Sequence, residues 1–153
     1  MKLTDLAILD WVLINNTPHK IQAIDSIDAE ILADDELYYV GEDRCHSEDK
    51  IEGIPLTPEI LEKNGFNPLT FLTDEWEKEV YYKEFSSCVV EPDDSGKYIF
   101  GTTKYWSQTY SDGSPIDWGT MYESRICNLQ YVHELQRALR CCGLWDIADN
   151  FKI

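Results

Sequence analysis

The stretch Ile54–Phe66, IPLTPEILEKNGF, carries signals for both ends of a short α-helix. Thr57 is a good N-cap, because its hydroxyl can accept a hydrogen bond from a free backbone N–H of the first turn. Pro58 follows at the first helical position, where a missing N–H costs nothing. Gly65 can take the left-handed conformation that ends a helix, and Phe66 can fold back on the last turn. The sequence therefore predicts a short capped helix, and these signals concern architecture rather than chemistry.

The segment before this helix contains short apolar pieces separated by polar turns. Trp11–Ile14 is apolar and is followed by the turn chemistry of Asn15–Pro18, after which Lys20–Ile24 alternates. Two further apolar pieces, Glu30–Leu32 and Leu37–Val40, are separated by acidic residues. Several short strands with acidic turns predict a small antiparallel structure, either an SH3-like β-barrel or a curled sheet.

The segment after the helix, residues 76–127, has the composition of an antiparallel β-meander. Runs rich in β-branched and aromatic residues alternate with clusters of turn-forming residues. The expected strands are Glu79–Phe85, Ser87–Val90, Lys97–Trp106 and Met121–Cys127, with turns at Pro92–Gly96 and Ser111–Pro115.

A longer helix is predicted near the C-terminus from the spacing of apolar residues along one face. That face comprises Leu129, Val132, Leu135, Leu139 and Cys142, and the polar face comprises Gln130, Glu134, Arg137 and Arg140. Asn128 could cap the helix and Gly143 could end it, and the apolar tail up to Ile153 is expected to dock. The fold class is therefore α+β, with the C-terminal helix packed on the sheet. We expect a small β lobe at residues 1–52 and an α+β lobe at residues 53–153, or one continuous domain.

Two motifs give the chain a resemblance to a known group of sequences. Ile54–Phe66 resembles the pattern I-P-L-T-x-E-I-L-x-K-x-G-F of small uncharacterised proteins from gut bacteria and from their phages and mobile elements, and Tyr131–Gln136, YVHELQ, resembles their Y-V-H-x-L-Q helix. Leu9–Val12 is similar to their first strand, although Leu9 and Asp10 stand where that group has Ile or Leu with Gly and Asn. The resemblance implies an N-terminal β-barrel, a capped helix, a meander and a C-terminal helix, and it implies no activity.

The charge of the chain restricts its partners. The 153 residues include 29 acidic and 13 basic side chains, for a formal net charge of −16. Such a charge repels the phosphates of nucleic acids and of anionic membranes, and it permits a basic protein partner. The N-terminus lacks a signal-peptide pattern, no apolar run could span a bilayer, and the five cysteines form no C-x-x-C pair. These features predict a cytoplasmic protein.

The sequence assigns no catalytic, cofactor-binding or metal-binding residue. His133 could act as a general base, but without a nucleophile at a telling spacing we interpret it as a partly buried histidine bonded to a sheet carbonyl. Cys45–His46 could be half of a zinc site, yet Cys141–Cys142 is a poor second half, because adjacent helical residues diverge. The acidic cluster Asp25–Glu30 lacks the spacing of a calcium loop.

Aromatic residues gather in the second half of the expected meander. Tyr105, Trp106, Tyr110, Trp118 and Tyr122 flank a loop rich in Ser, Gly and Pro. Such residues can form a recognition surface or a ligand pocket, and they can equally be the core of a sheet. They are the candidate interaction surface, with the sheet core as the alternative.

These observations predict a non-enzymatic, acidic interaction or accessory protein, of phage or mobile-element origin if the resemblance holds. One alternative is a nucleic-acid mimic or anti-defence protein, which the charge suggests. Another is an enzyme that acts on a small ligand near the aromatic hairpin.

Overall fold

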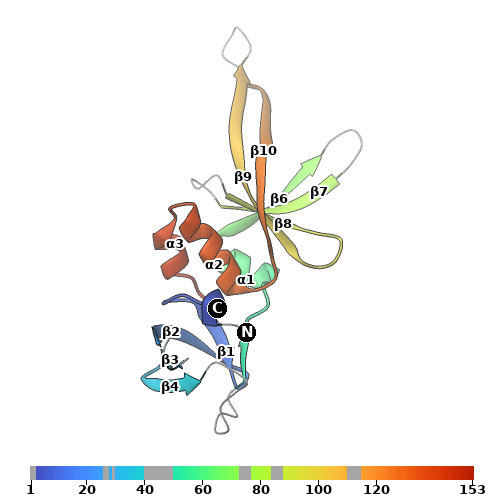
Figure 1. Ribbon diagram of the computed structural model, residues 1–153. Coiled ribbons are helices and arrows are strands. Elements are labelled where there is room, and N and C mark those ends of the chain that lie inside the picture. The colour runs from blue at the N-terminus through green and yellow to red at the C-terminus, as the bar shows by residue number, and fades with distance from the viewer. Residues whose placement is uncertain are drawn as a thin grey trace. The chain divides into compact units, whose positions relative to one another are not determined.

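The computed structural model describes residues 3–25, 28, 30–39, 50–72, 77–83, 88–109 and 115–153. The chain forms two compact units (Figure 1). Unit 1 comprises Met1–Thr57 together with Gln130–Ile153, and unit 2 comprises Pro58–Leu129. Each unit contains one antiparallel sheet of five strands, so the predicted α+β class is confirmed.

The sheet of unit 1 has the strand order β4-β3-β2-β1-β5. Its strands are β1 (Trp11–Ile14), β2 (Thr17–Asp25), β3 (Glu30–Ala33), β4 (Glu36–Tyr39) and β5 (Ile51–Gly53). The β1–β2 turn consists of Asn15 and Asn16 with φ of 51° and 65°, and the β3–β4 turn consists of Asp34 and Asp35 with φ of 49° and 66°. Two successive left-handed residues are typical of the tightest hairpin turns, and Asn and Asp tolerate them better than other side chains. The polar turns noted in the sequence therefore set these hairpins.

The sheet of unit 1 is open. Its edges are β4 and β5, and no pairing between described strands joins these edges. A barrel requires that ladder, because closure pairs the first strand with the last. The SH3-like barrel is therefore not confirmed, because the described strands pair as an open sheet. A register shift between Ile21 and Ala23 marks an irregularity in β2, where it changes from pairing with β1 to pairing with β3.

Unit 1 also contains the C-terminal helices α2 (Val132–Cys141) and α3 (Trp145–Asp149), and the short 3-10 helix η1 (Leu3–Asp5). The expected C-terminal helix is thus confirmed, and it contacts β1. Its predicted cap is wrong, because Asn128 belongs to a strand and the cap residue is Tyr131. Gly143, with φ of 77°, follows the helix as the sequence predicts. Docking of the tail is confirmed at Phe151, which is 2% exposed.

Two residues near the end of α2 differ in burial from the sequence prediction. The spacing predicts Arg140 on the polar face, and it is buried; the spacing predicts Cys142 on the apolar face, and it is exposed. The reason for the first is a buried carboxylate, Asp10, which pairs with the Arg140 guanidinium. Helical periodicity reports only apolar character, so it cannot reveal a buried ion pair.

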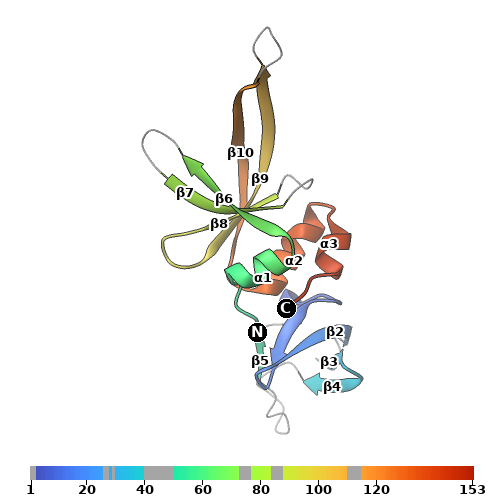
Figure 2. The same cartoon turned by 180° about the vertical axis from the view of Figure 1, so that it is seen from behind.

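The division of the chain differs from the expected lobes of residues 1–52 and 53–153. The C-terminal helices belong with the N-terminal sheet, in unit 1, rather than with the meander. Backbone pairing next to β5 explains this grouping, because Pro55 forms a β-bridge with Tyr131, and Val132 N–H donates to the Ile54 carbonyl at 2.9 Å. Figure 2 shows unit 1 from behind, with β5 and the C-terminal helices in view.

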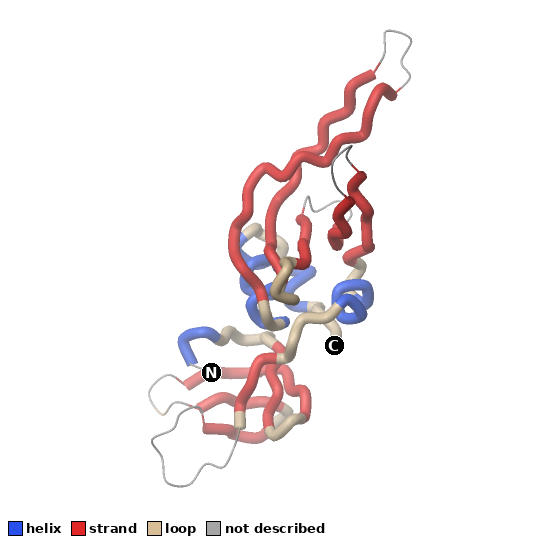
Figure 3. The backbone as a smooth tube through the Cα atoms, turned by 90° about the vertical axis from the view of Figure 1, so that its right-hand side faces the viewer, coloured by secondary structure: helices blue, strands red, loops and turns tan. Residues whose placement is uncertain are grey.

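Unit 2 is an antiparallel meander preceded by the predicted short helix, α1 (Pro58–Lys63). Its strand order is β10-β9-β8-β7-β6, so both the helix and the meander are confirmed. The strands are β6 (Phe66–Leu72), β7 (Glu77–Lys83), β8 (Cys88–Pro92), β9 (Tyr98–Thr109) and β10 (Pro115–Leu129), and Figure 3 shows them in red. The sequence does not predict strand β6, and its Pro68 is tolerated because β6 lies at the edge of the sheet. Buried residues Phe66, Val80 and Phe100 contribute to the core of this unit.

Within the described residues, no helix combines the length and the apolar character that crossing a membrane requires.

Candidate functional site

The aromatic residues proposed from the sequence lie on two paired strands. Tyr105 and Trp106 belong to β9, and Trp118 and Tyr122 belong to β10. The register pairs Tyr105 with Thr120 and Trp106 with Gly119. Their side chains lie outside the part that the structure describes, as does the whole of Tyr110. The candidate aromatic surface therefore stays a prediction.

Of the residues suggested for a zinc site, Cys45 and His46 lie outside the described residues. Cys141 and Cys142 are exposed. The zinc interpretation therefore stays a hypothesis from the sequence. Among the described residues, no group of three or more His, Cys, Asp and Glu side chains could hold a metal ion.

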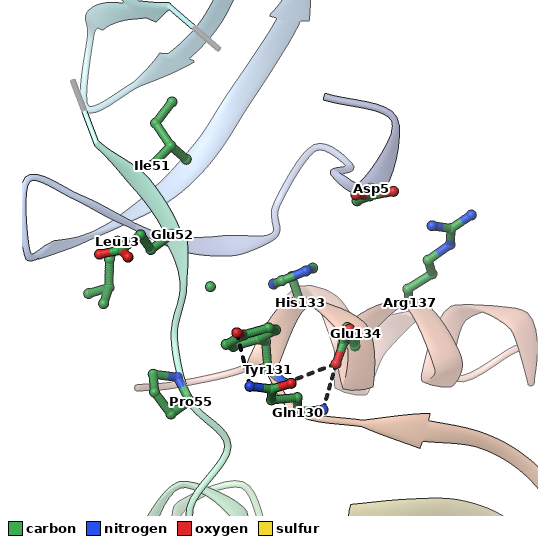
Figure 4. A pocket seen from close by; sticks show the side chains of 11 residues that line it. Asp5, Leu13, Ile51, Glu52, Pro55, Gln130, Tyr131, His133, Glu134 and Arg137 are labelled. Carbon is green, nitrogen blue, oxygen red and sulfur yellow. Dashed lines mark hydrogen bonds between the residues drawn. The ribbon is translucent and has the colours of Figure 1, made fainter. Parts of the chain in front are cut away.

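A pocket of about 650 Å³ lies within unit 1, where the start of α2 faces β5 (Figure 4). An aromatic pair, Tyr131 and His133, forms part of its wall. Its charged lining residues are Asp5, Glu52, Glu134 and Arg137. The volume falls in the range of ordinary small-molecule sites.

Backbone pairing places Tyr131 in this wall. Leu56 N–H donates to the Gln130 carbonyl at 3.0 Å, next to the bridge between Pro55 and Tyr131. Gly53 lies directly against the phenol ring, since a Cβ on Gly53 would come within 2.5 Å of Tyr131 Cγ. No real side chain tolerates that distance, so a glycine at position 53 is required for the observed position of Tyr131.

His133 is the most buried titratable group of the pocket, at 4% exposure. Its ring lies parallel to that of Tyr131, with 5.7 Å between the ring centroids and 10° between the planes. Its Nδ1 is buried and has no hydrogen-bond partner among the residues that the structure describes. The structural interpretation from the sequence is therefore confirmed for burial, but the expected bond to a carbonyl is not made at Nδ1.

Burial lowers the pKa of His133, because it disfavours the charged imidazolium. The carboxylates of Glu134, Asp10 and Asp5 oppose that effect, and Arg137 adds to it. With a pKa below the ordinary 6.5, His133 is neutral at pH 7, so one ring nitrogen is a donor and the other an acceptor.

The carboxylates of the pocket have different local roles. Glu134 Oε2 accepts from the backbone N–H of Gln130 at 2.6 Å and of Tyr131 at 3.0 Å, which caps α2. Glu52 pairs with Lys50 at 2.9 Å on the surface. Asp5 reaches the pocket from η1, and Figure 4 shows it beyond His133 on the side of Arg137. Carboxylates therefore outnumber the guanidinium around a neutral aromatic pair.

A buried ion-pair network holds the helix that carries His133. Arg140 Nη1 donates to Asp10 Oδ1 at 2.5 Å, and Arg140 Nε donates to Asp149 Oδ1 at 3.0 Å. Asp10 also accepts from the Ala7 N–H at 2.8 Å. Burial raises the pKa of Asp10, and the hydrogen bonds from Arg140 and Ala7 oppose the rise. The network ties the segment before β1 to α2 and α3.

Gln136 makes a second set of bonds between the same elements. Its Oε1 accepts from the Trp11 N–H at 3.0 Å, and its Nε2 donates to the carbonyls of Leu9 at 3.0 Å and Ala148 at 2.8 Å. The Trp11 indole donates to the Phe151 carbonyl at 2.8 Å. Sequence reasoning missed these roles, and the only available signal was a carboxylate, at position 10, directly before an apolar strand.

The described residues that line the pocket include no Ser, Thr or Cys that His133 could activate as a nucleophile. No protein-family model, curated protein or solved structure matches the chain.

Proposed function

We propose that the protein is a non-enzymatic, acidic interaction protein that binds a basic protein partner through the pocket of unit 1. The observation that carries this proposal is the lining of that pocket. Three acidic residues, Asp5, Glu52 and Glu134, line it together with one basic residue, Arg137, and with the aromatic pair of Tyr131 and His133.

The charge of the whole chain supports the same kind of partner. A net charge of −16 attracts cationic proteins over several ångströms and accelerates their encounter, and salt screens that attraction. The pocket would then select among cationic surfaces, because a concave site rewards a side chain that fits it.

The test is a binding titration with a fluorescein-labelled peptide of alternating arginine, lysine and glycine residues. The pair of substitutions Asp5→Asn and Glu52→Gln removes negative charge at the pocket. The matched control is Glu62→Gln with Asp94→Asn, which removes the same charge from exposed positions in unit 2. Fluorescence anisotropy at low and at physiological salt gives the affinities.

We expect the pocket pair to weaken binding about tenfold and the control pair to weaken it less than about twofold, since each lost charged contact is worth roughly 1 kcal/mol. An equal loss of peptide affinity in the two double variants would mean that the peptide responds only to the net charge of the protein. That result, or the lack of saturable binding, would contradict the proposal.

A second candidate is a nucleic-acid mimic or anti-defence protein, which the same −16 charge supports. The pocket favours the first candidate, because a mimic presents a row of carboxylates on a surface and needs no concave site. The enzyme alternative depends on the aromatic hairpin, whose side chains lie outside the described part, and it stays a prediction.

We also propose that the sheet of unit 1 is an open relative of the SH3-like barrel. Its order β4-β3-β2-β1-β5 supports this, as does the irregular register of β2 between its two partners. The proposed cytoplasmic location rests on the cysteine usage, and the proposed membership in a gut-bacterial or mobile-element group rests on the motifs at Ile54–Phe66 and Tyr131–Gln136.

A further inference from the structure

A second pocket of unit 1, of about 380 Å³, is formed by α2, by the start of α3 and by the segment around η1. Its apolar lining comprises Leu6, Ala7 and Trp145. Trp145 is 58% exposed, so a large aromatic surface at this pocket is in contact with water. Displacing water from apolar surface is favourable, and the volume lies within the range of small-molecule sites. The pocket therefore offers an apolar wall to the body of a ligand.

The segment before β1 that supplies Ala7 to this wall is held in place by several hydrogen bonds. Leu9 has φ of 71°, which bulky side chains rarely adopt. Its N–H donates to the Ile21 carbonyl at 2.8 Å, and its carbonyl accepts from Gln136 at 3.0 Å. The Ala7 N–H donates to Asp10 at 2.8 Å. Because this wall is already ordered, a ligand that binds there loses little affinity to the ordering of the protein.

Two arginines line the second pocket, and they differ in their partners. Arg140 bonds to Asp10 and Asp149, and its Nη2 also donates to the Ile8 carbonyl at 3.3 Å. Arg137 is exposed and forms no ion pair or hydrogen bond with any residue that the structure describes. Its guanidinium therefore keeps five N–H donors for a ligand.

The guanidinium of Arg137 indicates the sign of that ligand. Another exposed cation of unit 1, Lys50, pairs with Glu52 at 2.9 Å, so carboxylate partners are within reach of cations in this acidic unit. Arg137 also lines the first pocket, where Figure 4 shows it beyond Glu134 along α2. A cation next to an apolar wall is complementary to an anion that carries an apolar body.

We propose that the second pocket binds a small organic carboxylate, an aromatic or short aliphatic acid, whose carboxylate accepts hydrogen bonds from Arg137 and whose body lies against Trp145. A guanidinium matches a carboxylate with two parallel hydrogen bonds. The net charge of −16 repels such an acid at a distance, but salt screens that repulsion beyond about 8 Å under physiological conditions. The site goes beyond the proposed function, because its ligand has the opposite charge to a basic protein partner.

The experiment titrates the full chain with 4-phenylbutyrate, 4-phenylbutanol and 4-phenylbutylamine by isothermal calorimetry at physiological salt. The three probes share one apolar body and carry a negative, a neutral and a positive end. N-acetylglycylphenylalanine is a fourth probe, which presents a carboxylate at the end of a polypeptide.

Two neighbouring cysteines locate the bound acid. Cys141 and Cys142 are both exposed, and of these two only Cys141 is a described residue of the pocket lining. Alkylation by iodoacetamide, resolved at the two positions by mass spectrometry, should slow at Cys141 when 4-phenylbutyrate is bound. Cys142 is the internal control and should keep its rate.

The variants separate the two parts of the site. Arg137→Gln removes the cation, and Lys97→Gln is the matched control at an exposed position between β8 and β9. Trp145→Ala removes the aromatic wall. Arg137→Gln should bind the fluorescein-labelled basic peptide no more weakly than the parent protein, since it removes positive charge.

We expect saturable binding of 4-phenylbutyrate, with the alcohol and the amine about tenfold weaker, since a hydrogen bond to a charged group is worth roughly 1.5–3 kcal/mol. Arg137→Gln should weaken 4-phenylbutyrate by about the same factor, Trp145→Ala by about fivefold, and Lys97→Gln by less than about twofold.

Equal affinity for the alcohol, or equal slowing of both cysteines, would overturn the inference. A loss of peptide affinity in Arg137→Gln, parallel to the loss of carboxylate affinity, would show that Arg137 acts through the fold of unit 1 and would also overturn it. Tighter binding of N-acetylglycylphenylalanine than of 4-phenylbutyrate would contradict the assignment to a small free acid.

Discussion

At the level of single residues, Gly53 and Tyr131 depend on each other. The phenol ring occupies the space that any side chain at position 53 would need, at 2.5 Å from the nearest ring atom. Since Tyr131 also forms the bridge to Pro55 and lies parallel to His133, a shift of this ring would disturb the whole wall of the pocket.

Gly53→Ala should therefore displace Tyr131 and lower the free energy of unfolding of unit 1 by about 1–3 kcal/mol, the usual cost of overpacking. Urea unfolding and the NMR signals of Tyr131 and His133 would measure both effects. Gly96→Ala is the control: it strains a left-handed residue, at φ of 79°, where an added Cβ would meet no described residue within 4 Å other than its chain neighbours. It should lower the stability of unit 2 and leave the Tyr131 signals in place. Unchanged Tyr131 signals in Gly53→Ala would show that the ring is not displaced and would contradict this prediction.

The pH dependence of stability is a second prediction for a single residue. Because the pKa of His133 in the folded state lies below the ordinary 6.5, the unfolded chain binds more protons between these two values. The free energy of unfolding should thus fall as the pH falls from about 6.5 toward the lowered pKa. Four charged groups act on the ring, and all four are unchanged in the variant His133→Phe: Asp5, Asp10, Glu134 and Arg137.

His133→Phe keeps a flat ring and removes the titration, so its stability should change less over this pH range. Urea unfolding at a series of pH values between about 7 and about 5 gives the slopes. Identical slopes for the parent and His133→Phe would show that His133 does not titrate in this range.

At the level of elements, α2 is attached to the N-terminal segment by polar groups as well as by apolar ones. Arg140 and Asp10 are 9% and 1% exposed and form a buried pair, and Gln136 bonds to the backbone on both sides of it. A broken buried pair leaves one charge uncompensated, whereas removal of both charges is much less costly.

Arg140→Met should lower the free energy of unfolding by about 3–5 kcal/mol, because Asp10 would stay buried without its partner. The double variant Asp10→Leu with Arg140→Met should recover a large part of this loss, as measured by urea unfolding. Arg137→Met, at an exposed position of the same helix, should change stability by less than about 0.5 kcal/mol. A double variant no more stable than Arg140→Met would mean that the pair acts through its other hydrogen bonds.

At the level of the whole molecule, unit 1 is assembled from both ends of the chain. Met1–Thr57 supplies the sheet, and Gln130–Ile153 supplies the helices that pack with it. Unit 2 is continuous in sequence, and its strands follow one another in chain order. The two units should therefore respond differently to loss of the C-terminal segment.

A stop codon after Gly143 removes Ala148, Asp149 and Phe151, which bond to or pack with the rest of unit 1. We expect the backbone amides of unit 1 to exchange faster with solvent, while those of unit 2 keep their protection. Hydrogen exchange followed by NMR resolves the two sets of amides. A stop codon after Asn150, which removes only the last residues including Phe151, should have a smaller effect. Equal protection of unit 1 in the parent and in the shorter chain would contradict the anchoring role.

Local features were predictable from the sequence because their causes are local. The capped helix α1 follows from Pro58 and Gly65, whose backbone preferences act within one turn. The tight hairpins follow from pairs of Asn or Asp, and the meander follows from alternating strands and turns. Strand β6 was not predicted because proline is compatible with a strand mainly at the edge of a sheet. The sequence alone does not show that the strand containing Pro68 lies at an edge.

Patterns along the chain were enough to establish the α+β class, the main helices and most of the strands of this acidic protein, because capping, turn chemistry and side-chain periodicity act over a few residues. Three outcomes became visible only in the folded chain: the C-terminal helices join the N-terminal sheet, Arg140 is buried, and His133 lines a pocket. Those outcomes depend on contacts such as that between Trp11 and Gln136, which are 125 residues apart. No local pattern records a partner so distant along the chain, since that contact forms only when the whole unit folds.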